Sequence, residues 1–96
     1  MMTKKIMTIL DAIKNNKPVT AGLSSSLKFF LESENGKGYW KWYFERGFPL
    51  SAQCVDVEQI GKERLYRFLL PLSETTWYQL SALTNENGEW MQIRWW

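Results

Sequence analysis

The chain has 96 residues, of which 45% are hydrophobic, 23% are charged and 16% are aromatic, and its formal net charge is +2. This length suits one domain, and this composition excludes an intrinsically disordered chain. The sequence has no histidine, the commonest general base and metal ligand, and its single cysteine, Cys54, has no partner for an intrachain disulfide. We expect Cys54 to be a buried thiol in a reducing compartment, with an intermolecular disulfide as the alternative.

Residues 1–17 are predicted to form an amphipathic helix. The apolar residues of this segment recur at the spacing of one helical face: Ile6, Ile9, Leu10 and Ile13. Thr3 can cap the first turn, and the run Asn15–Pro18 ends the helix. Because Asp11 and Lys14 interrupt the apolar stretch, it is too short and too polar for a secretory signal or a membrane span. We therefore expect a cytoplasmic protein that does not associate with membranes.

Residues 18–26 are predicted to be a linker, since small and polar side chains dominate this segment. The Gly-Leu-Ser-Ser-Ser stretch within it lacks the glycine spacing and the Lys-Ser/Thr ending of a phosphate-binding loop. The segment is therefore interpreted as a connection between elements and not as a phosphate site.

Beyond the linker, the spacing of apolar side chains changes to two, which predicts strands. One side of the first two strands would carry Leu27, Phe29, Leu31, Trp40, Trp42 and Phe44. The run Glu34–Gly38 between these strands favours a hairpin turn, because Asn and Gly tolerate positive φ. After a loop at 46–49, strands are predicted near 52–58 and 63–70, joined by Gly61 and Lys62.

Residues 73–84 fit two structures. Ser73 can cap a helix that carries Trp77, Leu80 and Leu83, whereas Tyr78, Leu80 and Ala82 fit one face of a strand. An internal repeat favours the strand, because the pattern Leu-x-x-Glu-Asn-Gly occurs at 31–36 and at 83–88, each time before a tryptophan-rich run. Two hairpins with the same turn residues account for both copies, and the last strand then covers 89–96.

These elements predict an α+β fold for one domain, residues 1–96, in which the N-terminal helix packs on a curved antiparallel β-meander of five or six strands (27–96). Neighbouring strands joined by short turns pair in sequence order. The alternative is a small, partly closed β-barrel with one helix. In either fold we expect a core that includes Trp40, Trp42, Phe44 and Trp95. Partial exposure is expected for Tyr39, Tyr43, Trp90 and Trp96.

The sequence favours a protein without catalytic activity, metal or cofactor. Neither Cys54 nor the serines at 24–26 have a histidine to activate them, and no motif places a lysine of lowered pKa beside a serine. The carboxylates that remain as metal ligands are scattered over turns and strand ends. Asp56 and Glu58 share one face of a predicted strand, which a solvated polar face explains better than a glycosidase pair.

An aromatic-rich sheet face is the predicted functional site, with Tyr39, Lys41, Tyr43, Trp90, Arg94 and Trp96 as its binding residues. Interface cores are enriched in tryptophan, tyrosine and arginine. We expect this face to bind a protein partner, including a second copy of the chain as a homodimer, since one small core cannot easily bury fifteen aromatic side chains. The small size suits an inhibitor, an immunity protein or an accessory protein of a mobile element.

Single-stranded nucleic acid is the alternative ligand of the same face, because rings interleaved with cations can stack and steer bases. Against this alternative, residues 1–25 carry a net charge of +3 and residues 26–96 carry −1, so the aromatic part of the chain is not its basic part. Tight nucleic-acid binding needs cations where the bases stack. A small apolar ligand inside the curved sheet is a third possibility, although bulky rings would fill that space.

Overall fold

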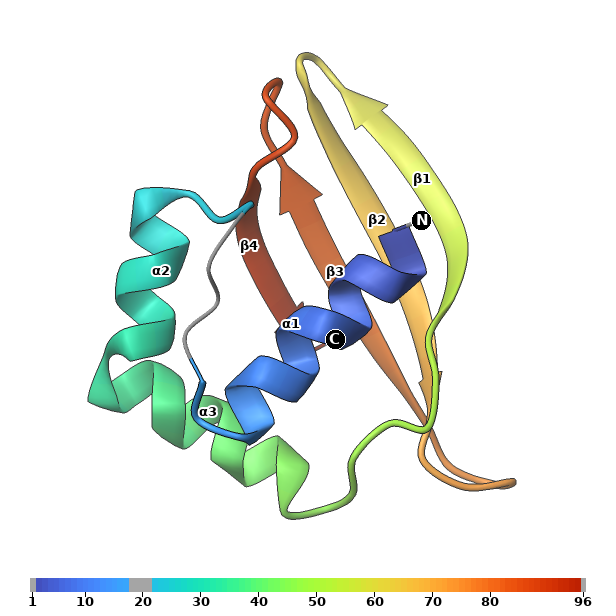
Figure 1. The fold of residues 1–96 in the computed structure, drawn as a ribbon. Helices are drawn as coiled ribbons and strands as arrows, with labels where there is room; N and C mark the ends of the chain where they lie inside the picture. Colours follow the sequence, from blue (N-terminus) through green and yellow to red (C-terminus); the bar gives the residue numbers. More distant parts are fainter. Residues whose placement is uncertain (1, 18–21, 96) are drawn as a thin grey trace.

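The computed structural model describes residues 2–17 and 22–95, which form three helices followed by four strands (Figure 1). The elements are α1 (Met2–Lys14), α2 (Ser25–Glu32), α3 (Glu34–Phe44), β1 (Gln53–Ile60), β2 (Glu63–Pro71), β3 (Trp77–Thr84) and β4 (Trp90–Trp95). The strands pair antiparallel in the order β1-β2-β3-β4. The predicted α+β meander is confirmed, but it has four strands and not five or six, and the sheet is not closed into a barrel.

Helix α1 is confirmed as the N-terminal amphipathic helix, and it crosses one face of the sheet (Figure 1). Ile6, Ile9 and Leu10 are buried on its sheet-facing side. The helix begins at Met2, so Thr3 lies within its first turn and does not cap it. Asn16 has a φ of 54°, a left-handed conformation that asparagine tolerates and that ends the helix.

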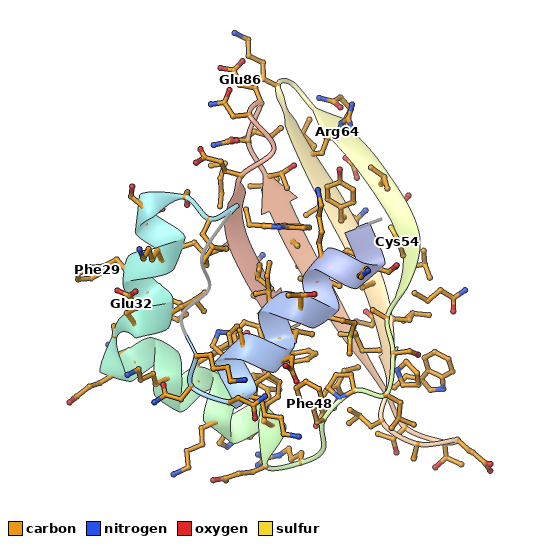
Figure 2. All side chains as sticks on the ribbon, in the orientation of Figure 1. Phe29, Glu32, Phe48, Cys54, Arg64 and Glu86 are labelled. Atoms are coloured by element: carbon orange, nitrogen blue, oxygen red, sulfur yellow. The ribbon has the colours of Figure 1, made fainter. Side chains whose placement is uncertain are left out.

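Helix α2 corrects two predictions: the linker ends before residue 25, and residues 27–32 are not a strand. The hydroxyl of Ser24 accepts a hydrogen bond from the backbone N–H of Leu27 at 3.3 Å, and this cap starts the helix. Leu27 and Leu31, one helical turn apart, then point inward. Phe29, which alternation places on the same side, points away from the molecule (Figure 2) and is 77% exposed.

Helix α3 replaces the predicted second strand and the predicted hairpin turn at 34–38. The hydroxyl of Ser33 accepts a hydrogen bond from the N–H of Gly36 at 3.0 Å, so this serine caps α3. The Glu-Asn-Gly copy at 34–36 therefore forms the first turn of a helix. The copy at 86–88 lies in the β3–β4 turn, where Gly88 has a φ of 78°.

The sheet presents one face to the helices, and that face builds the core. The prediction of a strand at 77–84 is confirmed, and the strands near 52–58 and 63–70 correspond to β1 and β2. The buried core consists of Ile6, Ile9, Leu10, Leu27, Trp40, Tyr66, Phe68, Leu70, Leu80, Ala82, Trp90, Ile93 and Trp95. Because Tyr66, Phe68 and Leu70 alternate with less buried residues along β2, only one side of the sheet is covered.

Candidate protein-binding surface

The six predicted binding residues do not lie on one sheet face. Tyr39, Lys41 and Tyr43 belong to α3, where the two tyrosines are half-buried and Lys41 is exposed. Trp90 and Arg94 belong to β4, and Trp96 lies outside the described residues. The structure does bring Tyr39 and Arg94 together, since both line a shallow depression of about 380 Å³ along β4.

Trp90 is a core residue, which corrects the prediction that it is partly exposed. Its side chain is 3% exposed and its ring packs on Tyr66 with 5.7 Å between ring centroids. Strict alternation along β4 would place Trp90 and Ile93 on different faces of the sheet. However, the β3–β4 pairing shifts register after Leu83. The bulge adds one residue to β4, so Trp90 and Ile93 point to the same side.

The predicted core aromatics are confirmed in part. Trp40 and Trp95 are buried, with 5.4 Å between their ring centroids, and Phe44 is half-buried against them. Trp42 is 52% exposed, because residues two apart on a helix point in different directions. Cys54, expected to be buried, is half-buried and lies on β1.

Tyr39 and Tyr43 fasten α3 to the last strand. The hydroxyl of Tyr39 accepts a hydrogen bond from the backbone N–H of Trp95 at 2.9 Å. The ring of Tyr43 lies 5.2 Å from the ring of Trp95, centroid to centroid. Burial raises the pKa of Tyr39 above its usual value of 10.0, while the hydrogen bond from Trp95 acts in the opposite direction. The inward-facing parts of both tyrosines therefore hold α3 against β4.

Replacing Tyr39 by phenylalanine is expected to lower the free energy of unfolding by about 1–2 kcal/mol, because the N–H of Trp95 loses its acceptor. Because the folded-state pKa of Tyr39 is raised, the folded chain holds this proton at a pH at which the unfolded chain releases it. The contribution of Tyr39 to the free energy of unfolding is thus intact below pH 10.0, and it falls as the pH rises above this value.

Denaturant unfolding at neutral pH and above pH 10.0 checks this expectation. The loss of stability at alkaline pH should be shallower for Tyr39→Phe than for the wild type. Tyr78→Phe is the matched control, since the Tyr78 hydroxyl has no hydrogen bond among the described residues. Equal alkaline slopes for Tyr39→Phe and the wild type would show that Tyr39 ionises freely in the folded chain.

No helix or strand of the described residues covers the sheet face opposite the helices, and this face is the candidate site (Figure 1). Strand register places fifteen residues of the four strands on this open sheet face: Gln53, Asp56, Glu58, Ile60, Glu63, Leu65, Arg67, Leu69, Pro71, Trp77, Gln79, Ser81, Leu83, Gln92 and Arg94. Leu65 and Leu83 pair directly across β2 and β3, and Leu69 lies four residues from Leu65 along β2, with the Arg67–Ser81 pair between them. All three leucines are half-buried, so accessible apolar side chains lie on both sides of the central Arg67.

Charged side chains surround the leucines in an uneven pattern. The guanidinium of Arg67 contacts the carboxylates of Asp56 at 2.5 Å and of Glu58 at 3.3 Å, so the β1 side is acidic overall. On the β4 side, Arg94 is exposed and forms no ion pair among the described residues. The open sheet face therefore has an acidic flank on β1 and a basic flank on β4.

The sequence of β2 carries a signal for this face. Leu65, Arg67 and Leu69 alternate with the buried residues of β2, which indicates a strand with two different apolar sides. The arrangement combines apolar area with a central arginine, a composition typical of interface cores. Of the rings proposed for stacking nucleic-acid bases, Tyr39 and Tyr43 lie on α3 and Trp90 lies in the core, so these three are not displayed on this face.

Comparison of the chain with family models, with curated proteins and with solved structures finds no match. None of the helices within residues 2–17 and 22–95 has the length and apolarity required to cross a membrane. The surfaces of the fold and the chemistry of their side chains therefore carry the evidence for a function.

Proposed function

We propose that this chain is a non-catalytic protein-binding domain that acts through its open sheet face. The observation that carries the proposal is a four-stranded sheet with helices on one side and accessible leucines on the other. An antiparallel sheet facing water normally alternates apolar and polar side chains, so Leu65, Leu69 and Leu83 on the exposed side need another explanation. Burial against a protein partner supplies it.

A second copy of the chain is the partner that the charges support. When two open faces pack about a two-fold axis parallel to the strands, β1 of one copy lies over β4 of the other. Asp56 and Glu58 then meet Arg94 of the second copy on both sides of the leucines. Pairing through the exposed edge of β1 is less favourable, because it would place the acidic side chains Asp56 and Glu58 of both copies along one seam.

The biological setting belongs to the same proposal. A cytoplasmic location keeps the half-buried Cys54 reduced. A compact domain that covers part of another protein's surface without chemistry suits an inhibitor, an immunity protein or an accessory protein of a mobile element. Each of these roles would use the open sheet face as its contact.

Leu69→Glu is expected to convert the dimer to a monomer, because it introduces a charge at the centre of the buried face. Sedimentation equilibrium over a range of protein concentrations measures the molar mass. Phe29→Glu is the matched control, since it makes the same kind of change at an exposed apolar residue on the helical side. A wild-type chain that remains monomeric, or a Leu69→Glu dimer as stable as the wild type, would contradict self-association through this face.

A charge exchange tests the orientation of the two copies. Arg94→Glu should weaken the dimer by placing like charges together, and Arg94→Glu combined with Glu58→Arg should restore it. If the double variant is no tighter than Arg94→Glu alone, β1 does not lie over β4 of the partner.

A further inference from the structure

A groove on the helical layer is separate from the open sheet face. It has a volume of about 750 Å³ and lies between the C-terminal end of α1, helix α2 and helix α3. Its apolar floor is contributed by Ile13, Leu23, Leu31 and the edges of rings on α3. Lysines surround this floor, so we call the site the lysine groove: Lys14, Lys17, Lys28, Lys37 and Lys41.

The lysine groove concentrates positive charge. Its described lining includes five lysines and two glutamates, Glu32 and Glu45, a net charge of +3 in a chain whose total is +2. Lys14 lies over the ring of Phe48 at 4.5 Å, and within residues 2–17 and 22–95 none of the five lysines has a carboxylate within 4.0 Å. The groove therefore keeps a net charge of +3, and none of its lysines is held in an ion pair among the described residues.

The fold creates this cluster from segments that the sequence keeps apart. The end of α1 brings Lys14 and Lys17 from the basic N-terminal part of the chain. Lys28 of α2, together with Lys37 and Lys41 one turn apart on α3, completes the rim. The separation of basic and aromatic residues along the sequence does not hold in space, because Trp40 and Phe44 also line the groove.

Trp40, which also lines the groove, has an indole N–H without a hydrogen-bond partner among the described residues. Its side chain is 1% exposed, and its indole N–H is buried without a hydrogen-bond acceptor among residues 2–17 and 22–95. Buried donors are normally paired, so the indole N–H of Trp40 is an unsatisfied polar group behind the groove lining. The lining thus combines an aliphatic floor, a surplus of cations and one donor that lacks an acceptor.

We propose that the lysine groove binds an acidic segment of another protein that also carries apolar side chains. Carboxylates of such a segment would pair with the lysines, and its apolar side chains would cover Ile13, Leu23 and Leu31. Nucleic acid fits less well. The exposed rings Phe29, Trp42 and Trp77 lie outside the lining, and of the two rings within it Trp40 is buried and Phe44 is half-buried, so the lining offers no exposed ring for base stacking.

The two glutamates of the groove support the same assignment. Glu32 and Glu45 would repel the continuous line of charge along a phosphate backbone, whereas a peptide can place its carboxylates opposite lysines only. This site is independent of the proposed dimer, because the groove and the open sheet face lie on different layers of the fold.

The test is a fluorescence anisotropy titration of the full chain with a designed, labelled 16-residue peptide that has leucines along one helical face and glutamates elsewhere. A second peptide with serine at the leucine positions and a labelled oligothymidine of 12 nucleotides are measured in parallel. The leucine peptide should bind more tightly than either, and its affinity should fall as salt is added. Equal or tighter binding of the oligothymidine would overturn the assignment in favour of nucleic acid.

Two pairs of variants place the binding. Lys28→Gln with Lys41→Gln should weaken the leucine peptide by about fivefold, as expected from the loss of two solvent-accessible ion pairs. Lys4→Gln with Lys5→Gln removes the same charge from exposed positions of α1 outside the groove, and should change the affinity less than twofold. Equal effects of the two pairs, or no binding of the leucine peptide to the wild type, would overturn the proposal.

The indole N–H resonance of Trp40 gives a readout that does not depend on charge. On titration with the leucine peptide, this resonance should shift in a ¹⁵N-correlated spectrum, since Trp40 lines the groove that the peptide would occupy. Binding that leaves the Trp40 resonance in place, while moving those of residues on the open sheet face, would show that the peptide binds elsewhere.

Discussion

Gly36→Ala is expected to lower the free energy of unfolding by about 3 kcal/mol, and the melting temperature by about 15 °C. A Cβ atom at this position would collide with the backbone carbonyl of Phe30. The collision involves backbone on both sides, so no side chain can rotate to relieve it. Urea unfolding followed by circular dichroism measures the change.

The junction between α2 and α3 explains this sensitivity. The backbone N–H of Ser33 bonds to the carbonyl of Phe30 at 3.1 Å and its hydroxyl bonds to the same oxygen at 2.6 Å. The same hydroxyl accepts from the N–H of Gly36 at 3.0 Å, which draws the start of α3 onto the end of α2. Glycine at 36 is thus required by close approach and not by an unusual φ.

Gly38→Ala is the matched control, two residues along the same helix. No atom lies within 4 Å of a Cβ built there. Alanine should raise stability by about 0.5–1 kcal/mol, because it lowers the entropy of the unfolded chain and favours the helix. If Gly36→Ala is as stable as Gly38→Ala, the two helices do not meet as closely as described.

Trp40→Ala is expected to lower the free energy of unfolding by about 4 kcal/mol, the second large effect. Trp40 is 1% exposed and contacts the rings of Tyr39, Phe44 and Trp95, so its removal leaves a cavity between α3 and the sheet. Chemical denaturation measures the loss, and exposure of apolar surface to a fluorescent dye reports any loosening of the core.

Trp42→Ala is the matched control for Trp40→Ala, because it removes an exposed tryptophan from the same helix. Trp42 is half-exposed, and its main contact is the guanidinium of Arg46, 3.3 Å from the ring centroid. Loss of an exposed cation–π contact should lower stability by less than about 1 kcal/mol. If both variants destabilise the chain equally, α3 is rotated relative to its described position, and Trp42 belongs to the core.

The fold could be predicted from the sequence where the apolar residues follow either the helical spacing or the strand spacing of two, but not both. The stripe from Ile6 to Ile13 fits only a helix, and the alternation in β2 fits only a strand. Residues 39–44 are apolar or aromatic at five of six positions, so they match both periods. The deciding signals were the serines at 24 and 33, whose capping role becomes visible only when a helix follows.

The candidate surfaces were less accessible to sequence reasoning than the fold. The alternation of side chains along each strand predicts which residues share a face of the sheet. It does not predict which face the helices cover, because that depends on the packing of α2 and α3. The bulge after Leu83 moved Trp90 to the covered side, and a bulge has no sequence signature here. The lysine groove joins three segments, so their juxtaposition cannot be inferred from spacing along the chain.

The sequential order of the strands determines where chain entropy is lost on folding. Every pairing in the sheet joins neighbours along the chain through a short turn, so each closes only a small loop. Attachment of the helices instead joins distant residues, as between Tyr39 and Trp95, which are 56 positions apart. The main entropic penalty of forming this topology therefore arises when the helical layer docks, and the hairpins contribute little to it.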